Sequence, residues 1–272
     1  MTASEFTDIL KKESFIVFGT GFVAEMFYTA LCLHGLEDHI LCCMVSRPGS
    51  QAYFHGAKIR PYRETESLIC LAVHESVKNE IRFGENSRVI WIYPFLHDLL
   101  FGRPAAERVL PVRDILAGQS RDFNWLSLRY GAVKGIKEND PSLQDLYRKC
   151  QRLHCSPATA DRRLAHLKEL IGLLEETGFR HDRPLILDED LRVFDGMHRL
   201  ACAAWMGVPA LHCRIYGRSP LYDAILNEKL RLSDKYLKSL GMTEELDQLH
   251  ALCRELENRL PQTASARKEA IG

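Results

Sequence analysis

Residues 184–200 read Pro-Leu-Ile-Leu-Asp-Glu-Asp-Leu-Arg-Val-Phe-Asp-Gly-Met-His-Arg-Leu, and this stretch decides the fold of the second half of the chain. Its apolar runs predict a buried strand and a second short strand, followed by a polar turn and a helix. Gly196 lets the backbone approach a bound group closely, and the N–H groups that open the helix point outward with the positive end of its dipole. Because His198 and Arg199 lie beside it, the turn predicts a site for an anion or a phosphate.

The turn Asp195-Gly196-Met197-His198-Arg199 resembles the ParB/sulfiredoxin superfamily, in which a strand, a G-x-x-R-like turn and a helix form a nucleotide site. The resemblance spans roughly residues 126–216 and is strongest from residue 184 onward. The D-G-x-H-R spelling is most similar to the ParB-like free-serine kinases. The resemblance therefore implies a nucleotide-dependent kinase that phosphorylates a hydroxyl of a small metabolite or an activated sugar.

Two other branches of the superfamily fit the turn less well. Sulfiredoxins place their essential cysteine immediately before the His-Arg pair, where this chain has Met197, so we reject a sulfiredoxin activity. Chromosome-partitioning ParB proteins favour a Gly-Glu-Arg-Arg turn and add a basic helix-turn-helix segment. This chain has Asp195 before the glycine and His198 in place of an arginine, and its formal net charge is zero. We therefore expect no nucleic acid as a partner.

The resemblance also implies a role for each residue of the turn. Gly196, Met197 and Arg199 would bind the phosphates of ATP, of another NTP or of ADP. The catalytic residues would be His198, which would donate to the transferred group, and Asp195, which would hold Mg²⁺ or orient the acceptor. Each of these residue types alone more often has a structural role, but their convergence on one turn after a buried strand favours a functional interpretation.

A kinase also needs a carboxylate that takes the proton of the acceptor hydroxyl. The chain offers Glu138, Asp140 and Asp161 for this role, without a motif that chooses among them. Arg129 and the pair Arg162-Arg163 are further candidates for phosphate contacts, although adjacent arginines on a helix more often form a solvated face.

Strands and helices alternate in the first half of the chain, which predicts a small Rossmann-like domain with a parallel sheet over residues 1–118. The expected strands and helices are Ser14–Phe18, Phe22–Leu33, His39–Val45, Leu68–Val73, Glu75–Arg82 and Arg88–Tyr93. The predicted fold class is thus α/β, with this sheet joined to a C-terminal α+β domain and a helical tail.

Gly19, Gly21 and Ala24 follow the first expected strand and match the G-x-G-x-x-A form of the dinucleotide fingerprint. A dinucleotide site normally has an acidic residue at the end of the second strand, but this chain has Ser46-Arg47 there. We therefore interpret the glycines mainly as a sharp strand-to-helix turn. A site for NAD(P) or a sugar nucleotide is the alternative.

Residues 119–219 are expected to form the ParB/sulfiredoxin-like domain, after an ordered connector at 103–125. Its expected elements are a strand at Asn124–Tyr130, helices at Pro141–Leu153 and Ala160–Thr177, a hairpin, a helix at His198–Met206 and a strand at Ala210–Ile215. Residues 220–272 are expected to be a helical extension with a leucine face, interrupted at Gly241. That face would cover the second domain or pair with another copy in a homodimer.

The composition of the 272 residues, 46% hydrophobic and 26% charged, is that of an ordinary globular protein. The nine cysteines lie mostly in apolar runs and form no C-x-x-C pair, so we expect reduced core thiols and no zinc ribbon. Neither a signal peptide nor a long apolar run is evident, so we expect a cytoplasmic protein that does not bind membranes. Three functions remain open: the kinase, a non-catalytic NTP-binding regulator or scaffold, and an NAD(P)-linked enzyme.

Overall fold

The computed structural model describes residues 1–47, 49–119, 124–179, 183–217 and 232–259. The chain forms two compact units, Met1–Arg103 and Pro104–Gly272, and each contains a sheet of its own. Both sheets contain parallel strands, so the mixed α/β class expected from the sequence is confirmed.

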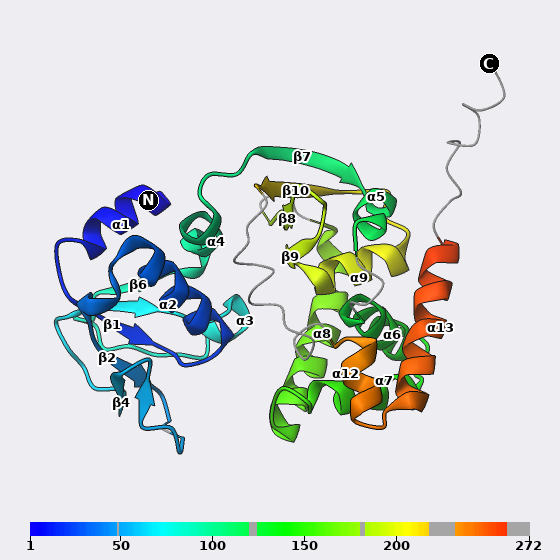
Figure 1. The fold of residues 1–272 in the computed structure, drawn as a ribbon, viewed down its shortest axis with the longest axis horizontal. Helices are drawn as coiled ribbons and strands as arrows, with labels where there is room; N and C mark the ends of the chain where they lie inside the picture. The colour runs from blue at the N-terminus through cyan, green and yellow to red at the C-terminus, as the bar shows by residue number, and fades with distance from the viewer. Residues whose placement is uncertain (48, 120–123, 180–182, 218–231, 260–272) are drawn as a thin grey trace. The chain divides into compact units, whose positions relative to one another are not determined.

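The first unit contains a six-stranded sheet with the strand order β3-β4-β2-β1-β5-β6 (Figure 1). Its strands are β1 (Phe15–Phe18), β2 (Ile40–Val45), β3 (Tyr53–Phe54), β4 (Ala57–Pro61), β5 (Leu68–Leu71) and β6 (Val89–Trp91). Its helices are α1 (Ala3–Leu10), α2 (Phe22–His34), the 3₁₀ turn η1 (Glu37–His39), α3 (Glu75–Lys78) and α4 (Tyr93–Phe101). All neighbouring strands pair in parallel except β3 with β4.

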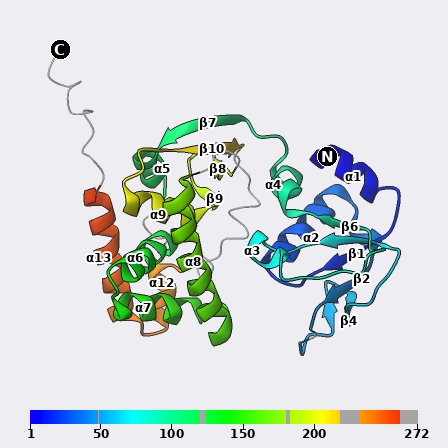
Figure 2. The ribbon, with the colours of Figure 1, turned by 180° about the vertical axis from the view of Figure 1, so that it is seen from behind.

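Four of these strands were expected, but the hairpin of β3 and β4 and the helices α1 and α4 were not. The helix expected at Glu75–Arg82 is shorter than predicted, because α3 ends at Lys78. Every residue of β1 is buried, as in a strand that is covered on both faces. Figures 1 and 2 view this sheet from opposite sides.

The second unit contains a four-stranded sheet with the order β7-β10-β8-β9. Its strands are β7 (Ala106–Pro111), β8 (Leu185–Asp188), β9 (Val193–Asp195) and β10 (Ala210–Tyr216). The pair β10 and β8 is parallel, whereas β7 with β10 and β8 with β9 are antiparallel. The expected hairpin and the expected closing strand are therefore present.

The boundary between the units lies between Arg103 and Pro104, earlier than the expected boundary after residue 118. The reason is β7, which pairs with β10 along its whole length and so belongs to the second sheet. The segment 103–125, interpreted from its prolines and glycine as a connector, contains β7 and the helix α5 (Val112–Ala117).

The prediction of a strand at Asn124–Tyr130 is wrong, because these residues form the N-cap and the first turns of the helix α6 (Trp125–Lys137). Trp125, Leu126 and Leu128 are all buried, and so are most of the following residues of the helix. A helix that is covered on nearly all sides gives a continuous apolar run, which periodicity alone does not distinguish from a buried strand.

The other helices of the second unit are α7 (Pro141–Gln151), α8 (Pro157–Thr177), α9 (Met197–Met206), α12 (Asp234–Ser239) and α13 (Thr243–Arg259). The apolar face predicted for α8 is confirmed by the burial of Leu164, Leu167, Ile171 and Leu174. Gly178 follows the last residue of α8, as expected.

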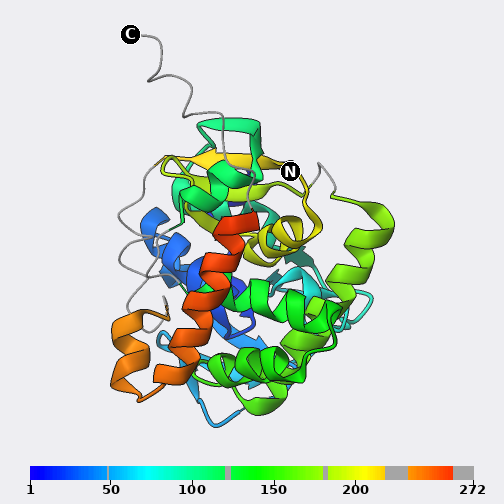
Figure 3. The same cartoon turned by 90° about the vertical axis from the view of Figure 1, so that its right-hand side faces the viewer.

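The tail covers the second unit, which was one of the two alternatives for its leucine face. Leu246, Leu249, Leu252 and Leu256 of α13 are buried in the core that α6 shares, and α13 lies against α6 in Figure 3. Glu255 accepts hydrogen bonds from Tyr130 Oη (3.0 Å) and Lys134 Nζ (2.6 Å) of α6. The parts of the expected helical extension at 220–231 and 260–272 lie outside the described residues.

Most cysteines are free thiols in the cores, as expected. Burial raises the pKa of Cys43, Cys150 and Cys202 to about 12, which keeps these thiols protonated. Within the parts of the chain that the structure describes, no helix has both the length and the apolar character needed to cross a membrane.

Candidate phosphate-binding site

The turn between β9 and α9 has a backbone conformation that requires glycine. Gly196 has a φ of +97° and occupies the N-cap position of α9. A Cβ atom at this position would lie 2.3 Å from Cδ2 of Leu185 and 2.9 Å from Nη2 of Arg199. Gly196 therefore allows β9 to run directly into α9, so that the first N–H groups of the helix lie at the end of the strand.

His198 lies in the first turn of α9 and is hydrogen-bonded to a side chain that the sequence did not single out. Its Nε2 atom lies 3.2 Å from Oη of Tyr147 in α7. Tyr147 is completely buried, and this burial raises its pKa, while the nearby cations Arg129 and Arg163 act in the opposite direction. The fold therefore brings together four residues from α6, α7, α8 and α9. We call Arg129, Tyr147, Arg163 and His198 the basic cluster.

The two arginines of the basic cluster are held by other side chains of the same unit. Nη1 of Arg129 donates to the carbonyl of Trp125 at 3.2 Å, and the guanidinium carbon lies 4.8 Å from the centroid of the Trp125 ring. Nη1 of Arg163 donates to Oε1 of Gln151 at 2.5 Å. These contacts restrict the directions of both guanidinium groups, which favours recognition of an anion with little loss of entropy.

Arg162 and Arg163 are both exposed on α8, as expected for residues on a solvated helix face. They differ in their contacts, because it is Arg163 that donates to Gln151 and lies near Tyr147. The solvated-face interpretation is consistent with the exposure of both arginines. The interpretation as a phosphate contact is consistent with the position of Arg163 near Tyr147.

Arg199 extends toward β8 rather than toward the basic cluster. Its Nη1 donates to the carbonyl of Arg183, and its Nη2 lies 3.5 Å from Oδ2 of Asp195. The side chain also lines a cavity together with Leu185. Two of the residues predicted for the site, Asp195 and Arg199, are therefore in contact with each other at the start of α9.

Met197 has a different environment from that of its neighbours in the turn. Its side chain is buried in the core of the second unit, so only the backbone N–H of this residue is suited to contact a ligand. The prediction that Met197 belongs to a nucleotide site is limited to that backbone group.

The carboxylates near the turn limit how a metal ion would be held. Among the residues with described positions, no group of three or more His, Cys, Asp or Glu side chains is arranged to hold a metal ion. Asp195, whose side chain is 27% exposed, supplies one carboxylate at the turn. One carboxylate fits an Mg²⁺ ion that takes its other ligands from phosphate oxygens and water, because Mg²⁺ in nucleotide sites is usually bound in this way.

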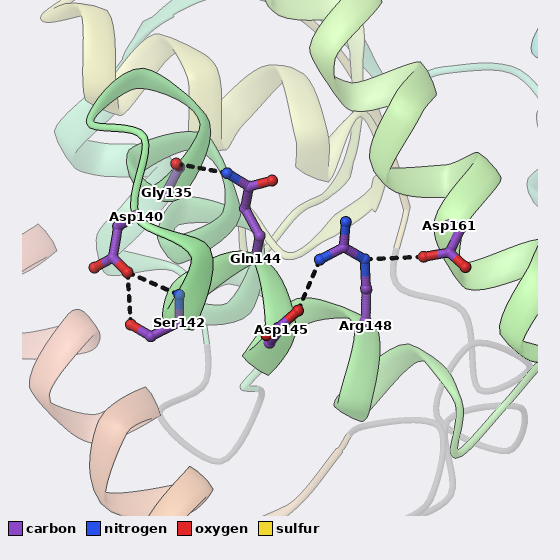
Figure 4. Close-up of polar contacts among 7 residues, drawn as sticks. All are labelled: Gly135, Asp140, Ser142, Gln144, Asp145, Arg148 and Asp161. Carbon is purple, nitrogen blue, oxygen red and sulfur yellow. Dashed lines mark hydrogen bonds and ion pairs between the residues drawn. The ribbon is translucent and has the colours of Figure 1, made fainter.

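Two of the three candidates for a general base have structural partners (Figure 4). Asp140 is the N-cap of α7 and accepts hydrogen bonds from the N–H (2.8 Å) and the hydroxyl (2.6 Å) of Ser142, which lower its pKa. Asp161 accepts a hydrogen bond from Nε of Arg148 at 2.9 Å. Glu138 is exposed at the C-cap of α6. The contacts of Asp140 and Asp161 are therefore with α7 and not with the turn.

The glycine turn of the first unit is explained largely by packing. Gly19 has a φ of +119°, and a Cβ atom there would lie 2.7 Å from the carbonyl oxygen of Ala72. Ala24, in the first turn of α2, is completely buried, whereas Gly21 has open space around it. The interpretation of Gly19 and Ala24 as a structural strand-to-helix turn is consistent with these positions.

The residues that the sequence did not reveal are Tyr147 and Gln151. Both lie on one face of the expected helix at Pro141–Leu153, four residues apart, and both are buried. Two polar residues at this spacing on an otherwise leucine-containing face were the available signal.

Comparison of the chain with protein-family models, with curated proteins and with solved structures finds no match in any of the three.

Proposed function

We propose that the second unit binds a nucleotide by its phosphates at the start of α9 and transfers a phosphoryl group to a hydroxyl of a small metabolite or an activated sugar. The observation that carries the proposal is the basic cluster, in which the hydroxyl of Tyr147 is hydrogen-bonded to His198 in the first turn of α9 and the charges of Arg129 and Arg163 lie near enough to lower the pKa of Tyr147. Fixed cations next to helix N–H groups form a favourable environment for phosphate oxygens.

The D-G-x-H-R turn supports the same function by its resemblance to the ParB-like free-serine kinases. Catalysis of phosphoryl transfer depends mostly on positioning and on neutralising charge. In this proposal the N–H groups after Gly196 and the two arginines of the basic cluster hold the phosphates of ATP, another NTP or ADP. His198 donates a hydrogen bond to the transferred group, with its ring oriented by Tyr147.

Asp195 is proposed to orient the acceptor hydroxyl, or to hold Mg²⁺ together with the nucleotide. When bound there, Mg²⁺ would neutralise part of the phosphate charge. Arg199 acts as a positioning residue for this carboxylate, because it lies 3.5 Å from it and is itself fixed by the carbonyl of Arg183. The first unit, with its parallel strand order, is proposed to be a Rossmann-like scaffold.

A regulator that binds an NTP without transferring phosphate is the second candidate. It is favoured by the contacts of Asp140 and Asp161, which serve α7 rather than an acceptor hydroxyl. Such a protein would use the same phosphate contacts and would not need a general base.

One experiment with Asp195→Asn distinguishes the two candidates. The full chain is incubated with Mg²⁺, a metabolite pool and ATP, ADP, GTP or CTP, and new phosphorylated species are followed by mass spectrometry. Nucleotide affinity is measured in parallel by calorimetry. A kinase is expected to lose most of its turnover in this variant and to keep its nucleotide affinity within a few-fold, because the carboxylate acts mainly in the transition state.

Asp247→Asn is the matched control, because Asp247 is exposed on α13 and far along the chain from the turn. Nucleotide binding without any phosphorylated product would support the regulator. The absence of binding by every nucleotide would overturn both candidates.

A further inference from the structure

The second unit contains a cavity of about 100 Å³ that lies between the C-terminal half of α8 and the strands β8, β10 and β7. Most of its lining is apolar, and the large apolar side chains that shape it are Leu170, Leu173, Leu174, Phe179, Leu185 and Leu211. For comparison, a dry cavity of about 150 Å³ in another protein holds benzene. At about two thirds of that volume, this cavity has room for an apolar group smaller than benzene, or for part of an aromatic ring whose remainder lies at its edge.

Two apolar side chains at this cavity are exposed to solvent. Val109 of β7 is 58% exposed and Leu173 of α8 is 46% exposed. Burial of apolar surface is favourable by about 25 cal/mol per Å². A ligand that covered these two side chains would therefore bind partly through the hydrophobic effect.

The polar side chains of the same cavity include three basic ones, Arg183, Arg199 and His212. None of the lining residues that the structure describes is acidic. The nearby carboxylate of Asp195 lies 3.5 Å from Nη2 of Arg199 and offsets one of these charges. The lining as a whole thus favours an anionic head group.

The C-terminal end of α8, which has the negative end of a helix dipole, also borders the cavity. Two of the carbonyl groups at this helix end accept hydrogen bonds from protein groups. The carbonyl of Leu173 accepts from Oγ1 of Thr177 at 2.9 Å, and that of Leu174 accepts from the N–H of Gly178 at 3.0 Å. These hydrogen bonds reduce the repulsion that the helix end would exert on an anion.

We propose that this cavity binds a small amphipathic anion, which has a compact apolar body and one carboxylate or phosphate group. The body occupies the leucine-lined space, and the head group lies among Arg183, Arg199 and His212. The proposal goes beyond the phosphate site, because the cavity lining shares no residue with the basic cluster. Of the turn between β9 and α9, Arg199 alone lines the cavity. The proposal therefore does not depend on the proposed phosphoryl transfer.

The test is calorimetric titration of the full chain with phenylacetate, phenyl phosphate and the neutral analogue phenylacetamide. We expect at least one of the two anions to bind with a Kd below about 1 mM and at least tenfold more tightly than the amide. The relative affinity of phenylacetate and phenyl phosphate shows which head group the site prefers.

Two variants locate the binding. Leu173→Trp places a larger side chain at the exposed edge of the cavity and is expected to weaken binding of the preferred anion at least tenfold. Its control is Leu240→Trp, because Leu240 is also 46% exposed and does not line the cavity. Arg183→Gln is expected to weaken the anion at least fivefold and to leave the affinity of the amide unchanged.

The melting temperature of each variant shows whether it is folded. Leu173→Trp is expected to fold, because Leu173 is at an exposed position where a larger side chain is tolerated. The proposal is overturned if no anion binds saturably to the unaltered chain, or if the amide binds as tightly as the anions. Equal affinities in the folded variants Leu173→Trp and Leu240→Trp would also overturn it. Loss of nucleotide binding in variants of the basic cluster would leave these results unaffected.

Discussion

Gly196 and Gly207 lie at the two ends of α9, and both have a left-handed backbone. They differ in their surroundings, because a Cβ atom at Gly196 would lie 2.3 Å from Leu185, whereas Gly207 has nothing within 4 Å. At the scale of single residues, the start of α9 is therefore set by backbone conformation together with packing, and its end by backbone conformation alone.

We predict that Gly196→Ala destabilises the second unit more than Gly207→Ala does. The left-handed backbone costs an alanine about 1–2 kcal/mol at either position, and only Gly196→Ala also displaces Leu185. The measurement is the free energy of unfolding from urea titrations of the two variants. Equal losses of stability would contradict the packing argument.

Arg162 and Arg163 provide a matched pair for the phosphate site. Arg163→Gln is expected to weaken binding of the nucleotide by about 1.5–3 kcal/mol, the typical contribution of a charge-assisted hydrogen bond. Arg162→Gln is expected to change the affinity by less than twofold, because both arginines are exposed on α8 but the contacts with Gln151 and Tyr147 are those of Arg163. Calorimetric titration with ATP, ADP and CTP measures both. If Arg162→Gln weakened binding as much as Arg163→Gln, the basic cluster would not be the phosphate site.

At the scale of elements, several helices begin at side-chain caps that the sequence displays. Asp140 caps α7, Ser156 caps α8 with a hydrogen bond to the N–H of Thr159, and Ser233 caps α12. Proline follows the cap in both α7 and α8, where its missing N–H has no effect on the hydrogen bonds of the helix. These signals are local, so the starts of these helices depend little on the rest of the fold.

The cap of α7 predicts a pH dependence. Hydrogen bonds from Ser142 lower the pKa of Asp140, so its contribution to stability is fully present above the pKa of an unfolded aspartate, near 4. That contribution is lost as the pH falls through the lower pKa of the folded state. We expect Asp140→Ala to lower the urea midpoint at pH 7 and to have a smaller effect at pH 3.

Asp140→Asn is the control for the charge, because asparagine also caps helices well. It should keep most of the midpoint at pH 7 and show a weaker pH dependence than the unaltered chain. An Asp140→Ala difference of the same size at pH 3 and pH 7 would contradict the assignment of the cap to the ionised carboxylate.

At the scale of the whole molecule, the division into two units depends on the pairing of β7 with β10, which are about a hundred residues apart in the chain. The segment that carries β7 also supplies Val112, Ile115 and Leu116 to the core of the second unit. The second unit therefore needs residues that precede the boundary expected from prolines and glycines.

We predict that a fragment of residues 104–272 folds and that a fragment of residues 119–272 does not. The shorter fragment lacks β7 and α5, which leaves β10 without one neighbour and removes the fully buried Ile115 from the core. Circular dichroism during thermal unfolding would show a cooperative transition for the longer fragment. A similar transition in the shorter fragment would show that β7 is dispensable.

By itself the sequence determined the elements with local signals. The order of strand, hairpin, glycine turn and helix around Gly196 followed from residues that are adjacent in the chain, and the buried face of α8 followed from the spacing of its leucines. Only the tertiary structure decided that Asn124–Tyr130 belongs mostly to a helix, because burial on nearly all sides removes the periodicity. It alone also brought Tyr147 to His198, and Arg129 and Arg163 near Tyr147, since these residues come from four helices whose packing no local pattern specifies.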